Sequence, residues 1–91
     1  MKEQRYTSQF KKDLKHFLNK PKKLKALNDV LDMLRNETPL PEEFRQHALH
    51  GNYCGCLECH IEGDFLLIWY DEENNTIALF RLGSHSDLFK K

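Results

Sequence analysis

The spacing of apolar residues changes along the chain, and this change limits the fold more than any other feature of the sequence. In the first part, apolar residues recur every three or four positions, as one face of a helix requires. They form two stripes, Phe10, Leu14, Phe17 and Leu18, then Leu24, Leu27, Val30, Leu31 and Leu34. Ser8 is expected to cap the first helix, and Pro21 to end it or start the second, which runs to about Arg35. Two helices joined by a short turn form an antiparallel hairpin.

The second part of the chain carries runs typical of strands. Three runs rich in aromatic and aliphatic residues span 53–61, 65–70 and 76–82, with polar turns between them at 62–64 and 71–75. Strands joined by such short connections pair antiparallel. A further short strand is expected at 3–6, whereas residues 38–51 are expected to be a loop and irregular chain.

These elements predict one α+β domain over residues 1–91, in the order β-α-α-β-β-β with a short C-terminal tail. The helical hairpin packs on one face of a mainly antiparallel four-stranded sheet, because amphipathic helices must bury their apolar stripe against another layer. The other face of the sheet is left for function. Gly83 is expected to end the last strand, and Ser84 to cap a final turn that carries Phe89.

Charge is distributed unevenly, although the formal net charge is zero. Residues 1–25 hold nine Lys or Arg and two Asp or Glu, whereas residues 26–91 hold five and twelve. A basic N-terminal third suits a surface that follows phosphates, and it equally suits a solvated helix face. No apolar run approaches the roughly 20 residues of a membrane span, and the first residues lead into no signal region. A reducing cytosol is therefore the expected compartment.

Three cysteines lie close together, in Cys54-Gly55-Cys56-Leu57-Glu58-Cys59-His60. Cys56 to His60 matches the pattern for c-type haem attachment, and the cysteines with His60 could be proposed as zinc ligands. Both interpretations are disfavoured, because haem attachment needs export and structural zinc sites use two separated ligand pairs. In a strand, Cys54, Cys56 and His60 would point to one face and Cys59 to the other. We expect neither a metal nor a cofactor.

The candidate chemistry rests on histidines in the C-terminal half, which are His47, His50, His60 and His85. They lie in loops or near strand ends, where functional side chains concentrate. His16 stands among lysines on the first helix and is interpreted as a bystander. Each histidine taken alone is more often structural than functional.

Asp64, in a turn, and Arg81, near the end of the last strand, complete a set suited to cutting RNA without a metal. The ribose 2′-hydroxyl must lose a proton, the attacked phosphate must be stabilised, and the leaving 5′-oxygen must gain a proton. Histidines and a carboxylate can share the proton transfers, while arginine holds the phosphate. The residues suggest a nuclease without establishing one.

Several segments resemble the YafQ branch of the RelE-type toxins of bacterial toxin–antitoxin pairs, over almost the whole chain. The matching segments are Thr7-Ser8-Gln9-Phe10-Lys11-Lys12-Asp13-Leu14, Pro39-Leu40-Pro41, His47-Ala48-Leu49-His50-Gly51, Glu58-Cys59-His60-Ile61-Glu62 and Arg81-Leu82-Gly83-Ser84-His85-Ser86-Asp87-Leu88-Phe89. The resemblance implies a RelE-like fold and a ribosome-associated endoribonuclease without a cofactor. It also implies a cognate antitoxin, mRNA and the ribosome as partners, no membrane, and operator DNA bound only through the antitoxin complex.

Carried over by motif, the resemblance assigns a catalytic role to His47, His60, Asp64, Arg81 and His85. It assigns substrate stacking to Phe65 and to the terminal aromatic Phe89, and it gives no role to His50.

Three departures from the family pattern bear on RNA binding. Phe65 stands where many relatives have tryptophan, Leu57 replaces a common arginine, and Cys54 and Cys56 replace a basic and an aromatic residue. The alternative from another class is therefore a RelE-fold module that binds antitoxin or RNA without cleavage. A metal-binding redox protein built on the cysteines is a more distant alternative.

Overall fold

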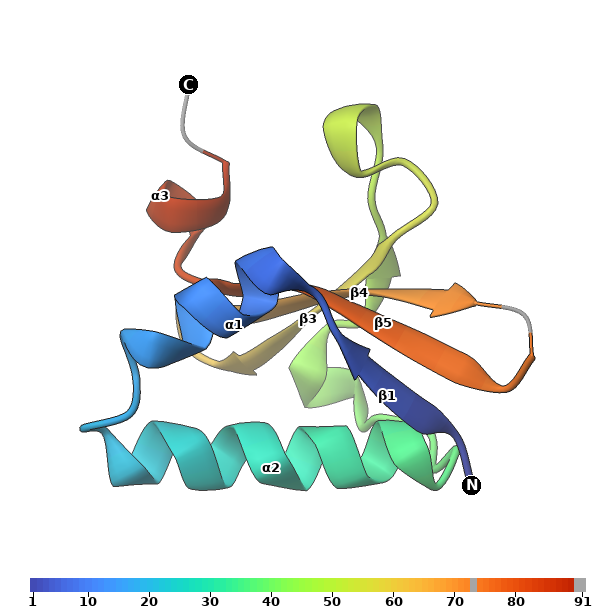
Figure 1. Ribbon diagram of the computed structural model, residues 1–91, viewed down its shortest axis with the longest axis horizontal. Coiled ribbons are helices and arrows are strands. Elements are labelled where there is room, and N and C mark those ends of the chain that lie inside the picture. Colours follow the sequence, from blue (N-terminus) through green and yellow to red (C-terminus); the bar gives the residue numbers. More distant parts are fainter. Residues whose placement is uncertain (73, 90–91) are drawn as a thin grey trace.

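The computed structural model describes residues 1–72 and 74–89 as a sheet with helices packed against it (Figure 1). In chain order the elements are β1 (Glu3–Tyr6), α1 (Ser8–Lys15), α2 (Pro21–Arg35), the 3-10 helix η1 (Glu42–Phe44), β2 (His47–Ala48), the 3-10 helix η2 (Gly51–Tyr53), β3 (Leu57–Glu62), β4 (Phe65–Glu72), β5 (Thr76–Gly83) and α3 (His85–Leu88). The predicted order of helices and strands is confirmed, with additions described next. Among the described residues, no helix is long and apolar enough to cross a membrane.

The sheet has five strands in the order β1-β5-β4-β3-β2, so the prediction of four strands is corrected. The added strand is β2, in a segment expected to be irregular, where His47 pairs with Glu58. β1 runs parallel to β5, with Glu3 opposite Thr76, and the other pairings are antiparallel. The sheet is therefore mixed.

Strand β3 begins at Leu57, four residues later than the sequence predicts. Gly51 and Gly55 adopt φ angles of +69° and +92°, a region that extended strands do not use. The chain there forms η2 and a turn instead. The predicted polar loop at 71–75 is also shorter, because β4 continues to Glu72 and a turn follows at 74–75; residue 73 lies outside the described residues.

The ends of α1 also differ from expectation. The N-cap is Thr7, not Ser8: its Oγ1 accepts the Phe10 N–H at 3.2 Å and donates to the Leu79 carbonyl at 2.7 Å. One side chain thus starts the helix and ties it to β5. α1 ends at Lys15, so Phe17 and Leu18 lie in the turn before α2, which begins at Pro21 as predicted.

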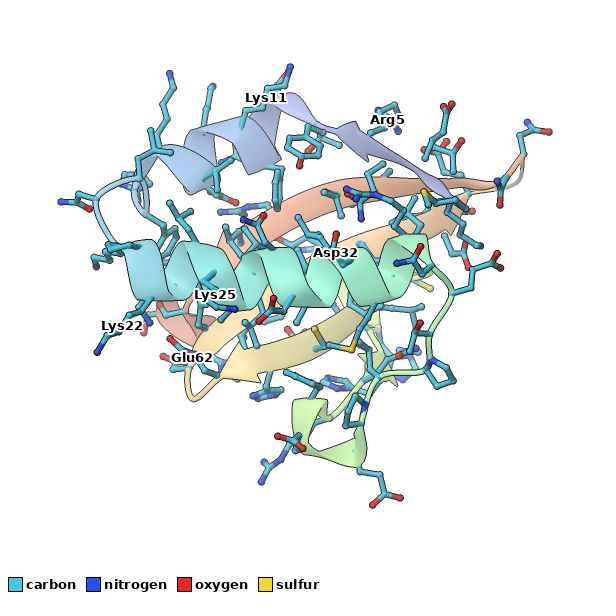
Figure 2. The ribbon with its side chains drawn as sticks, turned by 90° about the horizontal axis from the view of Figure 1, so that it is seen from below. Arg5, Lys11, Lys22, Lys25, Asp32 and Glu62 are labelled. Atoms are coloured by element: carbon cyan, nitrogen blue, oxygen red, sulfur yellow. The ribbon has the colours of Figure 1, made fainter. Side chains whose placement is uncertain are left out.

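The larger core lies between the sheet and the two long helices. Figure 2 shows α2 lying across this face of the sheet, with Lys22, Lys25 and Asp32 on its outer side. Phe10, Val30, Cys59 and Trp69 are at most 2% exposed there. A smaller cluster of Cys56, Leu66, Ile68 and Leu88 occupies the opposite face beneath α3. The predicted placement of the helices on one face is confirmed, and the opposite face is partly covered by the C-terminal tail.

Candidate active site

Three histidine rings and a phenylalanine ring form a row along the sheet face that carries the smaller core. The ring centroids are 6.3 Å apart for His47 and His60, 5.8 Å for His60 and His85, and 5.6 Å for His85 and Phe89. These side chains come from β2, β3, the start of α3 and the residue after α3. The fold thus brings together residues that lie up to 42 positions apart in the sequence.

Asp64 fixes the position of His85 through two contacts. Its Oδ1 accepts the backbone N–H of His85 at 3.0 Å and lies 3.0 Å from Nδ1 of the His85 ring. The backbone N–H, and after it the ring, lower the pKa of the Asp64 carboxyl below its usual value. With Nδ1–H directed at this carboxylate, Nε2 of His85 faces outward to take or give a proton. Ser84 caps α3 in a reciprocal capping box and so fixes the start of the helix that carries His85.

A second carboxylate, on Glu58, holds His47 and was not identified from the sequence. His47 Nε2 lies 3.1 Å from Glu58 Oε1, and its Nδ1 lies 2.7 Å from the Arg45 carbonyl. Both ring nitrogens of His47 thus face oxygen atoms. Glu58 is 1% exposed, and its Oε2 has no hydrogen-bond partner within the described part of the chain. The contact thus sets a half-exposed imidazole on a buried carboxylate beside His60.

His60 stands between these two pairs. Its Nδ1 makes only a long contact of 3.4 Å to the Gly63 carbonyl, in the turn that also carries Asp64. If Nδ1 holds the ring hydrogen in that contact, Nε2 presents a lone pair. Within the described residues, no carboxylate is hydrogen-bonded to His60, although Asp64 lies close enough to interact with its ring electrostatically.

Arg81 is held by Asp13 of α1, a residue that sequence reasoning did not single out. The guanidinium donates from Nε to Asp13 Oδ2 at 2.7 Å and from Nη2 to Oδ1 at 3.3 Å. Nη1 donates to the Tyr53 hydroxyl at 3.1 Å. These hydrogen bonds to Asp13 raise the pKa of Arg81 above its ordinary value. Three of the five guanidinium N–H groups are used in this way, and the other two can meet a phosphate.

Tyr53 connects Arg81 to the ring row. Its ring packs edge-on against Phe89 with centroids 5.7 Å apart, and its hydroxyl donates to the Leu88 carbonyl at 3.3 Å. A cavity of about 580 Å³ opens beside these residues, with Arg81 in its wall and His50 at its rim. This cavity therefore lies next to a partly exposed aromatic ring and a guanidinium.

Phe65 does not join the row. It is 3% exposed in the larger core, where its ring lies 4.8 Å from that of Phe17 and under the ammonium of Lys23. It is placed on the helix side of the sheet, where a base cannot stack on it. The stacking role predicted for Phe65 is therefore corrected, because the ring is buried under Phe17 and Lys23.

The cysteines divide between the two faces and the surface. Cys56 lies in the smaller core, Cys59 in the larger core, and Cys54 is exposed; all three are free. Cys54 falls outside β3, so the alternation predicted for it does not apply. Among residues 1–72 and 74–89, no three His, Cys, Asp or Glu side chains are grouped to hold a metal ion.

The chain matches, over residues 2–90, the family model described as "Bacterial toxin of type II toxin-antitoxin system, YafQ". The mRNA interferase toxin YafQ of Escherichia coli strain K12 is 33% identical over 85 residues, which cover 92% of this chain and 91% of that protein. A metal-bound toxin from Helicobacter pylori has a TM-score of 0.88 at 38% identity, covering 98% of this chain and 100% of that one. A chain of the E. coli DinJ–YafQ complex has a TM-score of 0.85 at 30% identity, covering 98% and 99%.

The mixed sheet with its two main helices is thus the fold of a solved bacterial toxin that belongs to a toxin–antitoxin complex. The chain belongs to the YafQ family of these toxins, as the match over residues 2–90 shows.

Proposed function

We propose that this protein is an endoribonuclease that cleaves mRNA at the His60–His85 centre. The observation that carries the proposal is the His85 ring, held by Asp64 at 3.0 Å and facing the His60 ring at 5.8 Å. Two imidazoles at this separation can contact opposite sides of one phosphodiester. The names of the curated relatives, mRNA interferase toxins, support the same activity.

The reaction needs two proton transfers and one stabilised phosphate. One histidine of the His60–His85 pair accepts the proton of the ribose 2′-hydroxyl as that oxygen bonds to phosphorus. The other donates a proton to the 5′-oxygen as the phosphorus–oxygen bond breaks. The N–H groups of Arg81 that Asp13 and Tyr53 leave unused stabilise the charge on the pentavalent phosphate. The products are a 2′,3′-cyclic phosphate, or the 3′-phosphate derived from it, and a 5′-hydroxyl.

Residues on either side of the His60–His85 pair support the reaction. The His47–Glu58 contact lies next to His60 and holds the His47 ring at the end of the row. Phe89 is 38% exposed and offers a face on which a base can stack, a contact worth about 1–3 kcal/mol. Of the two aromatic residues predicted to stack, Phe89 therefore carries this role in the proposal.

The proposal includes partners. The E. coli relatives are solved in complex with DinJ, which supports a cognate antitoxin that holds this toxin inactive. We further infer that cleavage takes place on ribosome-bound mRNA in the cytoplasm, and that operator DNA is bound only through the antitoxin complex. The uneven charge of the chain, basic in residues 1–25, supports contact with RNA outside the catalytic row.

Two measurements test the function. Expression without an antitoxin should stop bacterial growth, and co-expression of the antitoxin should restore it. Purified protein should cut mRNA on programmed ribosomes to give 5′-hydroxyl ends. A folded protein that binds its antitoxin but leaves mRNA intact on ribosomes would show that the chain is a non-catalytic binding module.

A further inference from the structure

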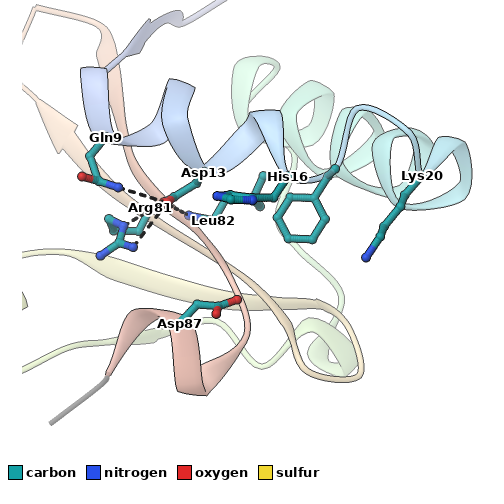
Figure 3. A pocket seen from close by; sticks show the side chains of 8 residues that line it. Gln9, Asp13, His16, Lys20, Arg81, Leu82 and Asp87 are labelled. Carbon is teal, nitrogen blue, oxygen red and sulfur yellow. Dashed lines mark hydrogen bonds and ion pairs between the residues drawn. The ribbon is translucent and has the colours of Figure 1, made fainter.

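A second cavity lies on the α1 side of Arg81, outside the histidine row. It measures about 430 Å³, within the range of about 300–1,000 Å³ typical of small-molecule sites. Figure 3 shows its lining: Gln9, Asp13 and His16 come from α1 and its end, Lys20 from the turn before α2, and Arg81 and Asp87 from the C-terminal part of the chain.

Arg81 belongs to the walls of both cavities, this one and the one beside Phe89. Contacts run from His85 through Phe89 and Tyr53 to Arg81, and Arg81 also lines the second cavity. A ligand that has one phosphate on Arg81 can place a neighbouring group in either cavity.

The lining of the second cavity suits a nucleotide. Lys20 and His16 are exposed at its rim, and they supply a cation and a ring donor. Gln9 donates to Asp13 at 3.1 Å, which leaves its carboxamide oxygen as an acceptor for a base edge. Asp13 itself receives hydrogen bonds from Arg81, Leu82 and Gln9, so its charge is already balanced. The cavity thus combines polar groups for a base with a cation for a phosphate.

We propose that this cavity is a second RNA subsite, which holds the nucleotide next to the cleaved linkage. The phosphate between the two nucleotides lies on Arg81, the base enters the cavity beside Gln9 and His16, and Lys20 binds the following phosphate. The strand then leaves towards the basic N-terminal third of the chain. This inference rests on the proposed function, because it extends the substrate of the same site. It gives His16, interpreted from the sequence as a bystander, a role in RNA binding.

The test measures how RNA affinity depends on the length of the RNA and on which lysine of the protein is changed. Fully 2′-O-methylated oligoribonucleotides of two and six nucleotides cannot be cut by 2′-hydroxyl attack, so fluorescence anisotropy measures binding alone. The dinucleotide has only the phosphate that lies on Arg81, so the parent protein should bind the hexanucleotide about 10-fold more tightly. Lys20→Gln should remove most of that difference and lower the slope of log K against log salt by about 0.7, the value for one lost phosphate contact on a single strand. Its affinity for the dinucleotide should not change.

Lys11→Gln is the matched control, because it removes one positive charge from exposed α1, away from the cavity lining. It should change hexanucleotide affinity less than twofold. His16→Ala should weaken hexanucleotide binding about threefold, because the ring contacts the base at short range. Thermal melting of each variant confirms that the fold is intact.

The outcomes separate this inference from the proposed function. A parent protein that cuts mRNA on ribosomes but binds both lengths equally, or for which Lys20→Gln and Lys11→Gln behave alike, has no second subsite. A parent protein that cuts no mRNA overturns the proposed function, whatever the length dependence of its binding.

Discussion

The ion pair between Asp13 and Arg81 should make a large contribution to stability, and Asp13→Ala tests it. The Asp13 side chain is 9% exposed and joins α1 to the end of β5. Its Oδ2 accepts the Leu82 backbone N–H at 2.9 Å as well as Nε of Arg81. The substitution removes both of these hydrogen bonds at once.

The expected cost follows from the groups left behind. Leu82 is 1% exposed, so its orphaned N–H loses about 1–3 kcal/mol. Arg81 loses a charge-assisted pair, which costs about 3–5 kcal/mol when both partners are fully buried. The Arg81 side chain is 21% exposed, so water recovers part of that loss. We therefore expect Asp13→Ala to lower the free energy of unfolding by about 3 kcal/mol.

Urea unfolding followed by circular dichroism measures this change. With a slope of about 1–3 kcal/mol per molar urea, the midpoint should fall by 1 M or more. Asp32→Ala is the control, because Asp32 pairs with Arg35 on the exposed side of α2, where such a pair contributes under about 1 kcal/mol. Equal midpoints for the two variants would refute the view that Asp13 ties α1 to β5. The double variant Asp13→Asn, Arg81→Met should lower the free energy of unfolding by less than the sum of the two single changes, because the double variant leaves no charged partner unpaired.

Three further predictions concern chemistry. His85→Ala should lower single-turnover cleavage of ribosome-bound mRNA by about 10²-fold with unchanged melting and RNA affinity, because the ring is 56% exposed and acts in proton transfer; undiminished cleavage by the folded variant would remove His85 from the mechanism. Cleavage should continue in excess chelator, and a loss that zinc restores would contradict the histidine mechanism. Iodoacetamide at neutral pH should modify Cys54 in the native protein and spare Cys56 and Cys59, since burial raises the pKa of both buried thiols, that of Cys59 to about 12. Mass spectrometry counts the adducts, and rapid labelling of all three thiols would show that the sheet opens.

The helices and the three main strands could be predicted because each carries its own periodicity. The stripe from Leu24 to Leu34 and the run from Phe65 to Tyr70 are local patterns that need no partner to be recognised. Pairing between distant segments leaves no such pattern. β2 has only two residues, and β1 pairs with β5 across more than 70 positions, so neither the fifth strand nor the parallel edge could be predicted.

In the candidate site, too, residues in local motifs could be predicted and contacts between distant segments could not. His60, Asp64, His85 and Phe89 were predicted through motif resemblance, and the structure brings these four side chains together. Glu58 and Asp13 were missed as site residues because a lone acidic residue in an amphipathic segment usually faces solvent. Only tertiary contacts reveal that both are buried carboxylates, one holding His47 and the other Arg81. The alternation of side chains along β4 puts Phe65 on the helix side of the sheet.

The parallel pairing of β1 with β5 has a consequence for how the chain matures during translation. β5 and the tail after it are synthesised last, yet β1, the Thr7 contact to Leu79 and the Asp13 contact to Arg81 all need them. Contacts of such long sequence separation form late in folding. The helices can form while the rest of the chain is still in the exit tunnel, but the first strand has nothing to pair with until residues 76–79 emerge. His85 and Phe89 follow even later. A nascent chain therefore lacks the row of rings from His47 to Phe89 until residues 76–89 have been made and have left the tunnel.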